Sequence, residues 1–155
     1  MADENLAAVV HHSGGSYPVV AGWGILDDLG RRFVDLDLKG PAYIITDTNV
    51  MNPYGRQAQL ALQKHGIAAH IFIIPAGETS KSFSLVQLIY DWLVERRAER
   101  GHPIIAVGGG VVGDLAGFVA ATFLRGVPFV QVPTSMAAMV DASIGGKVAV
   151  NLPQA

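Results

Sequence analysis

The sequence predicts an α/β fold: a Rossmann-like, mostly parallel sheet with helices on its faces. Short apolar runs of strand length alternate with longer stretches in which apolar residues recur every three or four positions. A glycine cluster directly follows one apolar run, and polar side chains stand at the ends of others. Because this alternation favours parallel strands joined by helices, we expect ligands to bind at the carboxyl ends of the strands.

Four elements are expected in the first part of the chain. Residues 17–20 have the composition of a short strand, and residues 22–32 have the apolar spacing of a helix. Residues 42–46 are a compact apolar strand, from which a polar turn leads into a helix over about residues 54–65. The apolar positions of the first helix are Trp23, Leu26 and Leu29, and the polar turn consists of Asp47, Thr48 and Asn49.

The middle of the chain predicts a strand at residues 69–74 and then a long helix. Ser80 or Ser82 can cap this helix, because a serine oxygen accepts a hydrogen bond from a free backbone N–H of the first turn. We interpret the charged residues within 95–100 as the solvated end of the helix. The apolar positions that predict the helix are Phe83, Val86, Ile89, Tyr90 and Leu93.

The glycine cluster follows the next strand, at residues 104–107. Gly108, Gly110 and Gly113 have the G-x-G-x-x-G spacing of a dinucleotide-binding turn. In such a turn glycines permit a positive φ, and the start of the next helix attracts an anion. The alternative is a cluster that serves only close packing. The turn also departs from the ordinary Rossmann fingerprint, because Asp141 comes too late to be the acidic residue for an adenosine ribose.

The last part of the chain predicts an alanine-rich helix at residues 115–123 and a strand at residues 129–132. Met136 and Met139 lie at helical spacing, and we expect them to be packing residues. The same part of the chain holds a second set of polar residues, in which cations beside a carboxylate suit the binding of a sugar phosphate. This set consists of Arg125, Thr134, Ser135, Asp141 and Lys147. The alternatives are a surface cation for Arg125, a loop cation for Lys147 and a helix or turn cap for Asp141.

Composition narrows the class of protein. A length of 155 residues suits one domain, and the half-apolar composition argues against disorder. The net charge of -2 provides no basic surface for nucleic acid. Cysteine is absent, which excludes disulfides and thiolate metal sites, and the five histidines form no metal motif. The start lacks a basic leader and no apolar run has membrane length, so we expect a soluble, cytoplasmic protein.

Two other nucleotide or hydrolase motifs are excluded. A Walker A loop ending at Gly146 and Lys147 would need a glycine in place of Asp141 and a hydroxyl residue in place of Val148. Ser143 lies outside a G-x-S-x-G sequence, which argues against a serine hydrolase.

Taken in order, four segments resemble the 3-dehydroquinate synthases, within the wider sugar phosphate cyclase family. They are DTN at residues 47–49, PAGETSK at 75–81, GGGVVGDLAGFVAATFLRG at 108–126 and VPTSMAAMVDASIGGKVAVN at 132–151. The resemblance covers nearly the whole chain. It implies that residues 1–155 are the amino-terminal NAD-binding domain of such an enzyme, and that the family's second, helical metal-binding domain is absent from this sequence.

The resemblance also implies a role for individual residues. Implied NAD contacts are Asp47, Thr48, Asn49, Glu78, Lys81, Gly109, Gly110, Val111, Asp114, Thr134 and Ser135. Implied substrate contacts are Arg125, Asp141 and Lys147. Ser135 replaces the second threonine of most members but keeps a hydroxyl. A homodimer is implied, in which a reach of Arg125 into the neighbouring subunit's site is one option.

For the parent protein the resemblance implies a lyase that converts 3-deoxy-D-arabino-heptulosonate 7-phosphate to 3-dehydroquinate and phosphate. This is a step of the shikimate pathway, which leads to chorismate and the aromatic amino acids. NAD is catalytic, and a divalent metal, zinc or cobalt, is bound outside this sequence, so we expect the chain to be inactive alone. The alternatives are another sugar phosphate cyclase, a polyol dehydrogenase-like domain, against which Val111 argues, and a non-catalytic NAD-binding module.

Overall fold

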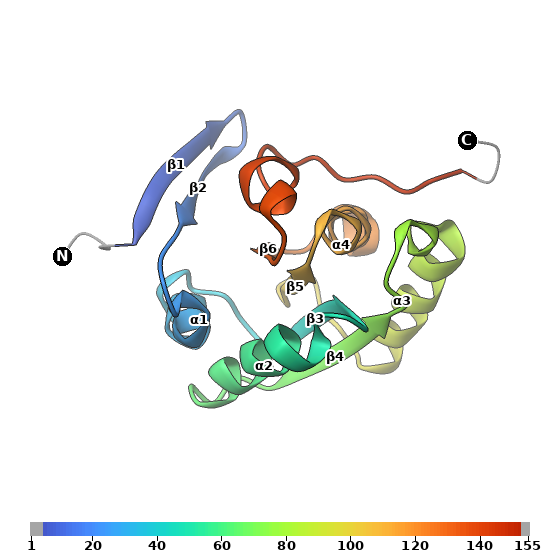
Figure 1. The fold of residues 1–155 in the computed structure, drawn as a ribbon. Helices are drawn as coiled ribbons and strands as arrows, with labels where there is room; N and C mark the ends of the chain where they lie inside the picture. Colours follow the sequence, from blue (N-terminus) through green and yellow to red (C-terminus); the bar gives the residue numbers. More distant parts are fainter. Residues whose placement is uncertain (1–4, 153–155) are drawn as a thin grey trace.

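A computed structural model describes residues 5–152 of the chain. Helices, strands and short 3-10 or π turns (η) alternate along it (Figure 1). In chain order the elements are β1 (Leu6–His12), β2 (Gly15–Val20), η1 (Ile25–Asp28), α1 (Leu29–Asp35), β3 (Ala42–Asp47), η2 (Met51–Gly55), α2 (Arg56–Gln63), β4 (Ala69–Ile74), η3 (Glu78–Ser80), α3 (Phe83–Glu95), β5 (Ile104–Gly108), α4 (Gly110–Thr122), η4 (Phe123–Arg125), β6 (Phe129–Pro133) and η5 (Ala138–Ala142).

The central sheet has four parallel strands in the order β4-β3-β5-β6. Helices cover both of its faces, which confirms the predicted α/β class (Figure 1). β1 and β2 form a separate antiparallel hairpin. The predicted strand at residues 69–74 coincides with β4, and the other predicted sheet strands are each extended by one residue.

Side-chain alternation along the strands divides the core into two layers. On β3, Tyr43 and Ile45 face a cluster that includes Val86 and Ile89 of α3 and Leu115 of α4. The intervening residues face the opposite cluster, formed with α1 and α2. These residues are Ala42 and Ile44, and their partners include Phe33, Ala58 and Leu62. The central strands β3 and β5 are therefore buried on both faces, whereas the outer strands β4 and β6 are mostly half-buried. We expect ligands to reach the central strands at the edges where these strands begin or end.

Three local expectations are corrected. The first helix begins later than predicted, because Gly24 is left-handed with φ 71° and η1 and α1 follow it. Trp23 precedes that turn and is fully exposed, so it is not a packing position. The predicted helix at residues 54–65 begins as the π turn η2, in which the carbonyl of Val50 accepts bonds from Tyr54 N (2.9 Å) and Gly55 N (3.0 Å).

The choice of helix cap is settled between the two serines. Ser82 caps α3, with its Oγ accepting from Leu85 N at 3.4 Å. Ser80 is buried and its hydroxyl donates to the carbonyl of Pro75 at 2.6 Å. Ser80 therefore fastens the end of β4 to the following turn, which is a structural role of its own.

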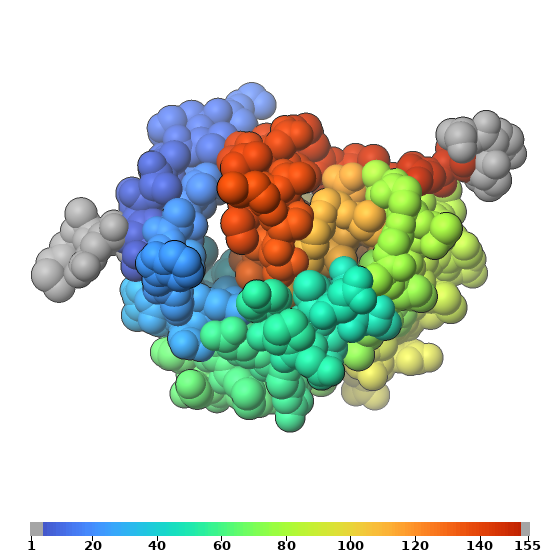
Figure 2. Space-filling model, viewed as in Figure 1, coloured from blue at the N-terminus to red at the C-terminus, as the bar shows by residue number. Residues whose placement is uncertain are grey.

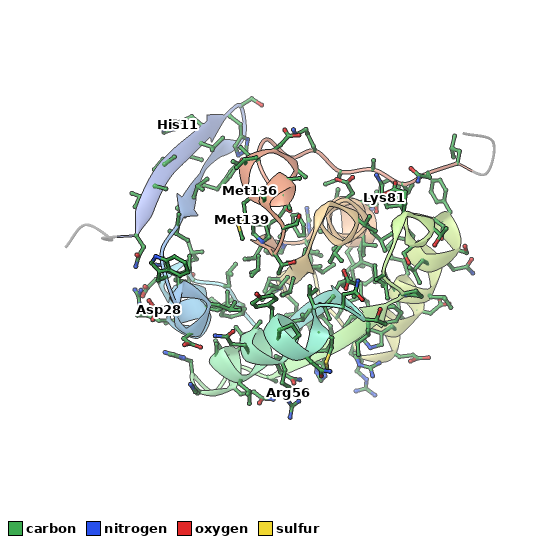
Figure 3. All side chains as sticks on the ribbon, viewed as in Figure 1. His11, Asp28, Arg56, Lys81, Met136 and Met139 are labelled. Atoms are coloured by element: carbon green, nitrogen blue, oxygen red, sulfur yellow. The ribbon has the colours of Figure 1, made fainter. Side chains whose placement is uncertain are left out.

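The expectation that Met136 and Met139 pack is wrong for this chain. Their side chains are 75% and 51% exposed, and Val140 beside them is 67% exposed. Figure 3 shows the two methionines on the segment between the hairpin and α4. In the space-filling view the same segment lies between these two elements on the surface (Figure 2). Helical spacing predicts a common face, but it does not establish that another element of the chain covers that face.

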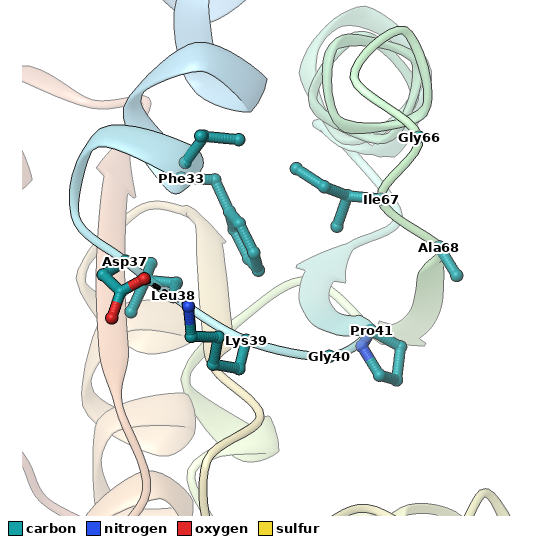
Figure 4. Close-up of a pocket in the computed structure, with 10 residues that line it drawn as sticks. Phe33, Asp37, Leu38, Lys39, Gly40, Pro41, Gly66, Ile67 and Ala68 are labelled. Carbon is teal, nitrogen blue, oxygen red and sulfur yellow. Dashed lines mark hydrogen bonds and ion pairs between the residues drawn. The ribbon is translucent and has the colours of Figure 1, made fainter.

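A hollow of about 430 Å³ lies at the amino ends of the strands (Figure 4). Phe33, Leu38 and Pro41 contribute apolar lining, and Lys39 at its margin pairs with Asp37. None of the candidate site residues predicted from the sequence lies in it. Across residues 5–152, no helix is both long and apolar enough to cross a membrane.

Candidate functional site

The polar clusters that follow the strands lie at one edge of the sheet. β3 ends at Asp47, β4 at Ile74, β5 at Gly108 and β6 at Pro133, and all four strands run in parallel. Carboxyl ends of parallel strands share an edge, so the structure brings together the residues that follow them. The convergence predicted from the sequence is present, although the roles of the individual residues remain predictions.

The turn after β3 is organised by its own side chains. Asp47 Oδ1 accepts from Asn49 N at 2.8 Å and from Val50 N at 3.2 Å. Thr48 Oγ1 accepts from Ala76 N at 3.2 Å, which joins this turn to the one after β4. Asp47 and Thr48 therefore fix the conformation of this turn, and the side chain of Asn49 is exposed.

A chain of polar contacts joins the start of α3 to α4. Lys81 Nζ lies 2.8 Å from Asp114 Oδ2 and 3.4 Å from Glu78 Oε1. Asn151 Nδ2 donates to the same Glu78 oxygen at 2.9 Å. Lys81 and Asp114 are largely buried, whereas the Glu78 side chain is 62% exposed. Among the three charged members of the group, Glu78 is therefore the one that solvent or a ligand reaches most easily.

The pKa values of this group follow from its contacts. The hydrogen bond to Asp114 raises the pKa of Lys81 above its usual value, even though partial burial acts in the opposite direction. The hydrogen bond from Asn151 lowers the pKa of Glu78, and Lys81 adds to this effect. At neutral pH both groups are charged, with the ammonium directed at two carboxylates.

The glycines after β5 fall into two pairs. A Cβ on Gly108 would lie 2.5 Å from the Val112 side chain, and one on Gly113 would lie 2.8 Å from Gln131 Oε1. A Cβ on Gly109 or Gly110 would meet only ordinary contacts, at 3.4 Å to Ser135 and 3.7 Å to Ala142. The close-packing interpretation thus holds for Gly108, whereas the atom that faces Gly113 is the movable end of a side chain, and Gly109 and Gly110 leave room beside the backbone.

The expectation of positive φ in this turn is wrong. The glycines with positive φ lie elsewhere, and they include Gly145 and Gly146 at 86° and 69°. Gly109 is extended, with φ -77° and ψ -168°, and α4 starts at the next residue. A left-handed conformation is therefore not the reason for glycine in this turn. Neighbouring atoms come close to some of these glycines, and beside the others the backbone is open.

The first turn of α4 is suited to an anion. α4 has thirteen residues, its N-cap is Gly109, and its first four residues are glycine and valine. The free N–H groups at a helix start carry partial positive charge, and no side chain of these residues competes for them. Thr134 and Ser135 lie beside the turn, because Thr134 N donates to the Gly108 carbonyl at 2.9 Å.

Asp141 and Lys147 form an ion pair on the loop that follows β6. Gln131 Nε2 donates to the carbonyl of Ser143 at 3.3 Å. The hydroxyl of Tyr17 in β2 accepts from Gly145 N at 2.9 Å. Since Ala142 approaches Gly110, this loop lies next to the start of α4. The structure therefore places the loop that carries this carboxylate and this cation beside the start of α4.

Arg125 is not brought to this site within the chain. It is exposed and is the last residue of η4, three positions beyond the end of α4, with φ 67°. A helix of thirteen residues is about 20 Å long, so Arg125 lies near the amino ends of the strands while Gly110 lies at the carboxyl ends.

Three residues of the site were not predicted from the sequence: Tyr17, Gln131 and Asn151. Tyr17 and Asn151 act through contacts that cross 128 and 73 residues of chain, whereas Gln131 contacts Ser143, 12 residues further on. No local sequence pattern marks any of these contacts. Among residues 5–152, no three histidine, aspartate or glutamate side chains gather closely enough to hold a metal ion.

Comparisons with a family model and with known sequences point to the same family. The family described as 3-dehydroquinate synthase N-terminal matches residues 71–155. The 3-dehydroquinate synthase of Symbiobacterium thermophilum is 48% identical over 141 residues, which cover 89% of this chain and 39% of that protein. That of Prochlorococcus marinus is 42% identical over 156 residues, covering 99% of this chain and 42% of the relative. The chain thus spans about two fifths of the length of these curated relatives.

Solved structures show the same fold. A 2-deoxy-scyllo-inosose synthase complexed with carbaglucose-6-phosphate, NAD+ and Co2+ has a TM-score of 0.86 at 27% identity, over 94% of this chain and 39% of that chain. A 2-epi-5-epi-valiolone synthase from Streptomyces hygroscopicus with NAD+ and Zn2+ bound has a TM-score of 0.71 at 32% identity, over 80% and 35%. A probable glycerol dehydrogenase from Sinorhizobium meliloti, at 20% identity, a TM-score of 0.55 and coverage of 72% and 26%, shares the fold.

Proposed function

Because the chain belongs to the 3-dehydroquinate synthase family by its amino-terminal part, we propose that residues 1–155 form the NAD-binding domain of such an enzyme. The parent protein is then a lyase of the shikimate pathway. It converts 3-deoxy-D-arabino-heptulosonate 7-phosphate to 3-dehydroquinate and phosphate in the cytoplasm. The isolated domain does not complete this reaction alone.

The single observation that carries the proposal is the uncovered start of α4. Side chains at Gly109 and Gly110 would fit the fold, yet both positions lack them, so the backbone stays open to a large ligand. The negative charge of the NAD pyrophosphate matches the partial positive charge of this helix start. The family relation and the NAD-containing neighbours support the same assignment.

The remaining NAD contacts follow from position along the same edge. The N–H groups at the start of α4 bind the pyrophosphate, and the exposed carboxylate of Glu78 accepts hydrogen bonds from ribose hydroxyls. Lys81 and Asp114 hold one another next to this carboxylate. The proposed set is Asp47, Thr48, Asn49, Glu78, Lys81, Gly109, Gly110, Val111, Asp114, Thr134 and Ser135.

The loop after β6 serves the substrate. Lys147 offers a cation to the phosphate or carboxylate of the sugar acid, and Asp141 orients it through their ion pair. Bound NAD supplies a reversible hydride acceptor. Arg125 lies too far away to join its own site, so we propose that it reaches the site of a second subunit in a homodimer.

The divalent metal of the family does not fit the described part of this chain, because no suitable cluster of ligands is found among residues 5–152. Two solved neighbours contain Co2+ or Zn2+. We assign the zinc or cobalt ligands to the parent enzyme outside this chain, and we derive no step through the metal.

Another sugar phosphate cyclase is the second candidate, because two of the neighbours among solved structures are synthases of 2-deoxy-scyllo-inosose and 2-epi-5-epi-valiolone. Identity is higher to the curated 3-dehydroquinate synthases, at 42–48%, than to those cyclases, at 27–32%. The test is phosphate release by the full-length parent with NAD and zinc. 3-Deoxy-D-arabino-heptulosonate 7-phosphate is compared with glucose 6-phosphate and sedoheptulose 7-phosphate. Turnover of the first alone supports the proposal, and turnover of either of the others in its place contradicts it.

A further inference from the structure

The segment after Lys147 lies across α4 and reaches the start of α3 (Figure 1). It crosses α4 closely, because a Cβ on Gly117 would lie 2.3 Å from Val148 Cγ1. Asn151 then forms a parallel bridge with Ser82, and its backbone N–H donates to the carbonyl of Lys81 at 2.8 Å. The segment that follows the substrate loop is thereby attached to the wall of the site that carries Lys81.

The side chain of Asn151 makes a second contact in the same place. Its Nδ2 donates to Glu78 Oε1 at 2.9 Å, a shorter distance than the 3.4 Å between that oxygen and Lys81 Nζ. Lys81 is also shared with Asp114, at 2.8 Å. The amide of Asn151 is thus the nearer of the two donors to Glu78, and the other donor is directed mainly at α4.

We propose that Asn151 is a positioning residue of the cofactor site, whose side-chain amide fixes the Glu78 carboxylate and whose backbone ties the substrate loop to the start of α3. This inference rests on the proposed function. An exposed carboxylate samples several rotamers, and fixing it before binding removes that entropic cost from the binding step. The lowered pKa of Glu78, caused chiefly by the Asn151 hydrogen bond, agrees with the geometry.

The test uses two variants of Asn151 and one control. Asn151→Ala removes the amide but keeps the backbone bond to Lys81, whereas Asn151→Asp puts a second carboxylate beside Glu78. Ser84→Ala is the matched control, because Ser84 lines the same small hollow and its hydroxyl contacts Ser82. Each protein is titrated with NAD by calorimetry, and the Glu78 carboxyl is titrated by NMR without NAD, with Glu78→Gln providing the assignment.

We expect Asn151→Ala to weaken NAD binding about three- to tenfold, the usual effect of one lost hydrogen bond. The pKa of Glu78 should rise in Asn151→Ala and rise further in Asn151→Asp, whereas Ser84→Ala should resemble wild type. The other charged groups near Glu78 are Lys81, at 3.4 Å, and Asp114, which pairs with Lys81. Both remain in all these variants, so they do not account for a change in the pKa of Glu78. A merely structural role would not move this pKa.

An unchanged Glu78 pKa together with unchanged NAD affinity overturns the inference. If the folded wild-type chain fails to bind NAD, the proposed function of the chain fails instead, and the NMR titration alone then decides whether Asn151 fixes Glu78. Circular dichroism verifies that the exposed substitutions leave the fold intact.

Discussion

The amino edge of the central sheet holds a buried cluster of aromatic rings, whereas the carboxyl edge ends in polar turns and glycines that leave the backbone accessible. At the amino edge Tyr43 is fully buried among His70, Trp92 and His102, with ring centroids 5.5–6.2 Å apart. Its hydroxyl donates to the carbonyl of Arg96 at 3.1 Å, and burial raises its pKa. The same four strands thus carry stabilising packing at one edge and the proposed ligand site at the other.

Because packing lies at the amino edge and the proposed NAD site at the carboxyl edge, we expect that stability and NAD affinity can be changed separately. Changes at the amino edge should reduce the free energy of unfolding and leave the affinity of the folded chain unaltered. Changes at Gly110 should reduce NAD affinity and leave the free energy of unfolding nearly unaltered. Gly108 lies between the two classes, because it is at the carboxyl edge but is packed against Val112.

The largest effect is expected for Trp92→Ala at the amino edge. Trp92 is 8% exposed and packs edge-on against Tyr43 and Phe72, with Arg96 over its ring. Its removal should lower the free energy of unfolding by about 3–5 kcal/mol. Urea denaturation measures this loss, and calorimetry on the fraction that stays folded should return the wild-type dissociation constant for NAD. A weakened dissociation constant would contradict the separation of the two edges.

Gly108→Ala should have the next largest effect on stability. The added methyl would lie 2.5 Å from the side chain of Val112, so the free energy of unfolding should fall by about 1–3 kcal/mol. Gly110→Ala is the matched control, because its methyl meets only Ala142 at 3.7 Å and should leave stability nearly unchanged. Equal losses in the two variants would show that the two pairs of glycines do not differ as described.

The smallest effect is a dependence of stability on pH that belongs to the carboxyl edge. Glu78 has a lowered pKa, so its stabilising contribution is present above the usual carboxyl value of 4.5 and is lost as pH falls through the lower folded value. Lys81 has a raised pKa, so its contribution is present below 10.5 and is lost as pH rises through the higher folded value. Asn151→Ala should flatten the acid limb only. Urea denaturation across pH measures both limbs, and a flattened alkaline limb would be evidence against the assignment.

Much of the fold is predictable from the sequence because its signals are local. Apolar runs predict β3, β4, β5 and β6, and the spacing of Val86, Ile89 and Leu93 predicts the buried face of α3. The later start of the first helix depends on the left-handed conformation of Gly24. Met136 is exposed because no other element of the described chain packs over its side chain. Neither of these features has a periodicity that could reveal it.

The candidate site was predicted in part for the same reason. Polar residues after strands are visible in the sequence, and parallel topology then brings Asp47, Glu78 and Gly109 to one edge. The supporting contacts of Tyr17 and Asn151 cross 128 and 73 residues of chain, so only the folded structure reveals them. The sequence leaves open whether the glycines pack or bind; the structure shows close contacts beside Gly108 and room beside Gly109 and Gly110, and a binding role for the latter two stays a proposal.

The central claim is that the start of α4 binds the pyrophosphate of NAD, and calorimetric titration of Gly110→Val with NAD tests it most directly. Gly101→Val is the matched control, because Gly101 also has room for a side chain but lies in the loop before β5, at the opposite edge. We predict that the wild-type chain and Gly101→Val bind NAD alike, and that folded Gly110→Val loses measurable binding. Wild-type affinity in a folded Gly110→Val variant would contradict the claim.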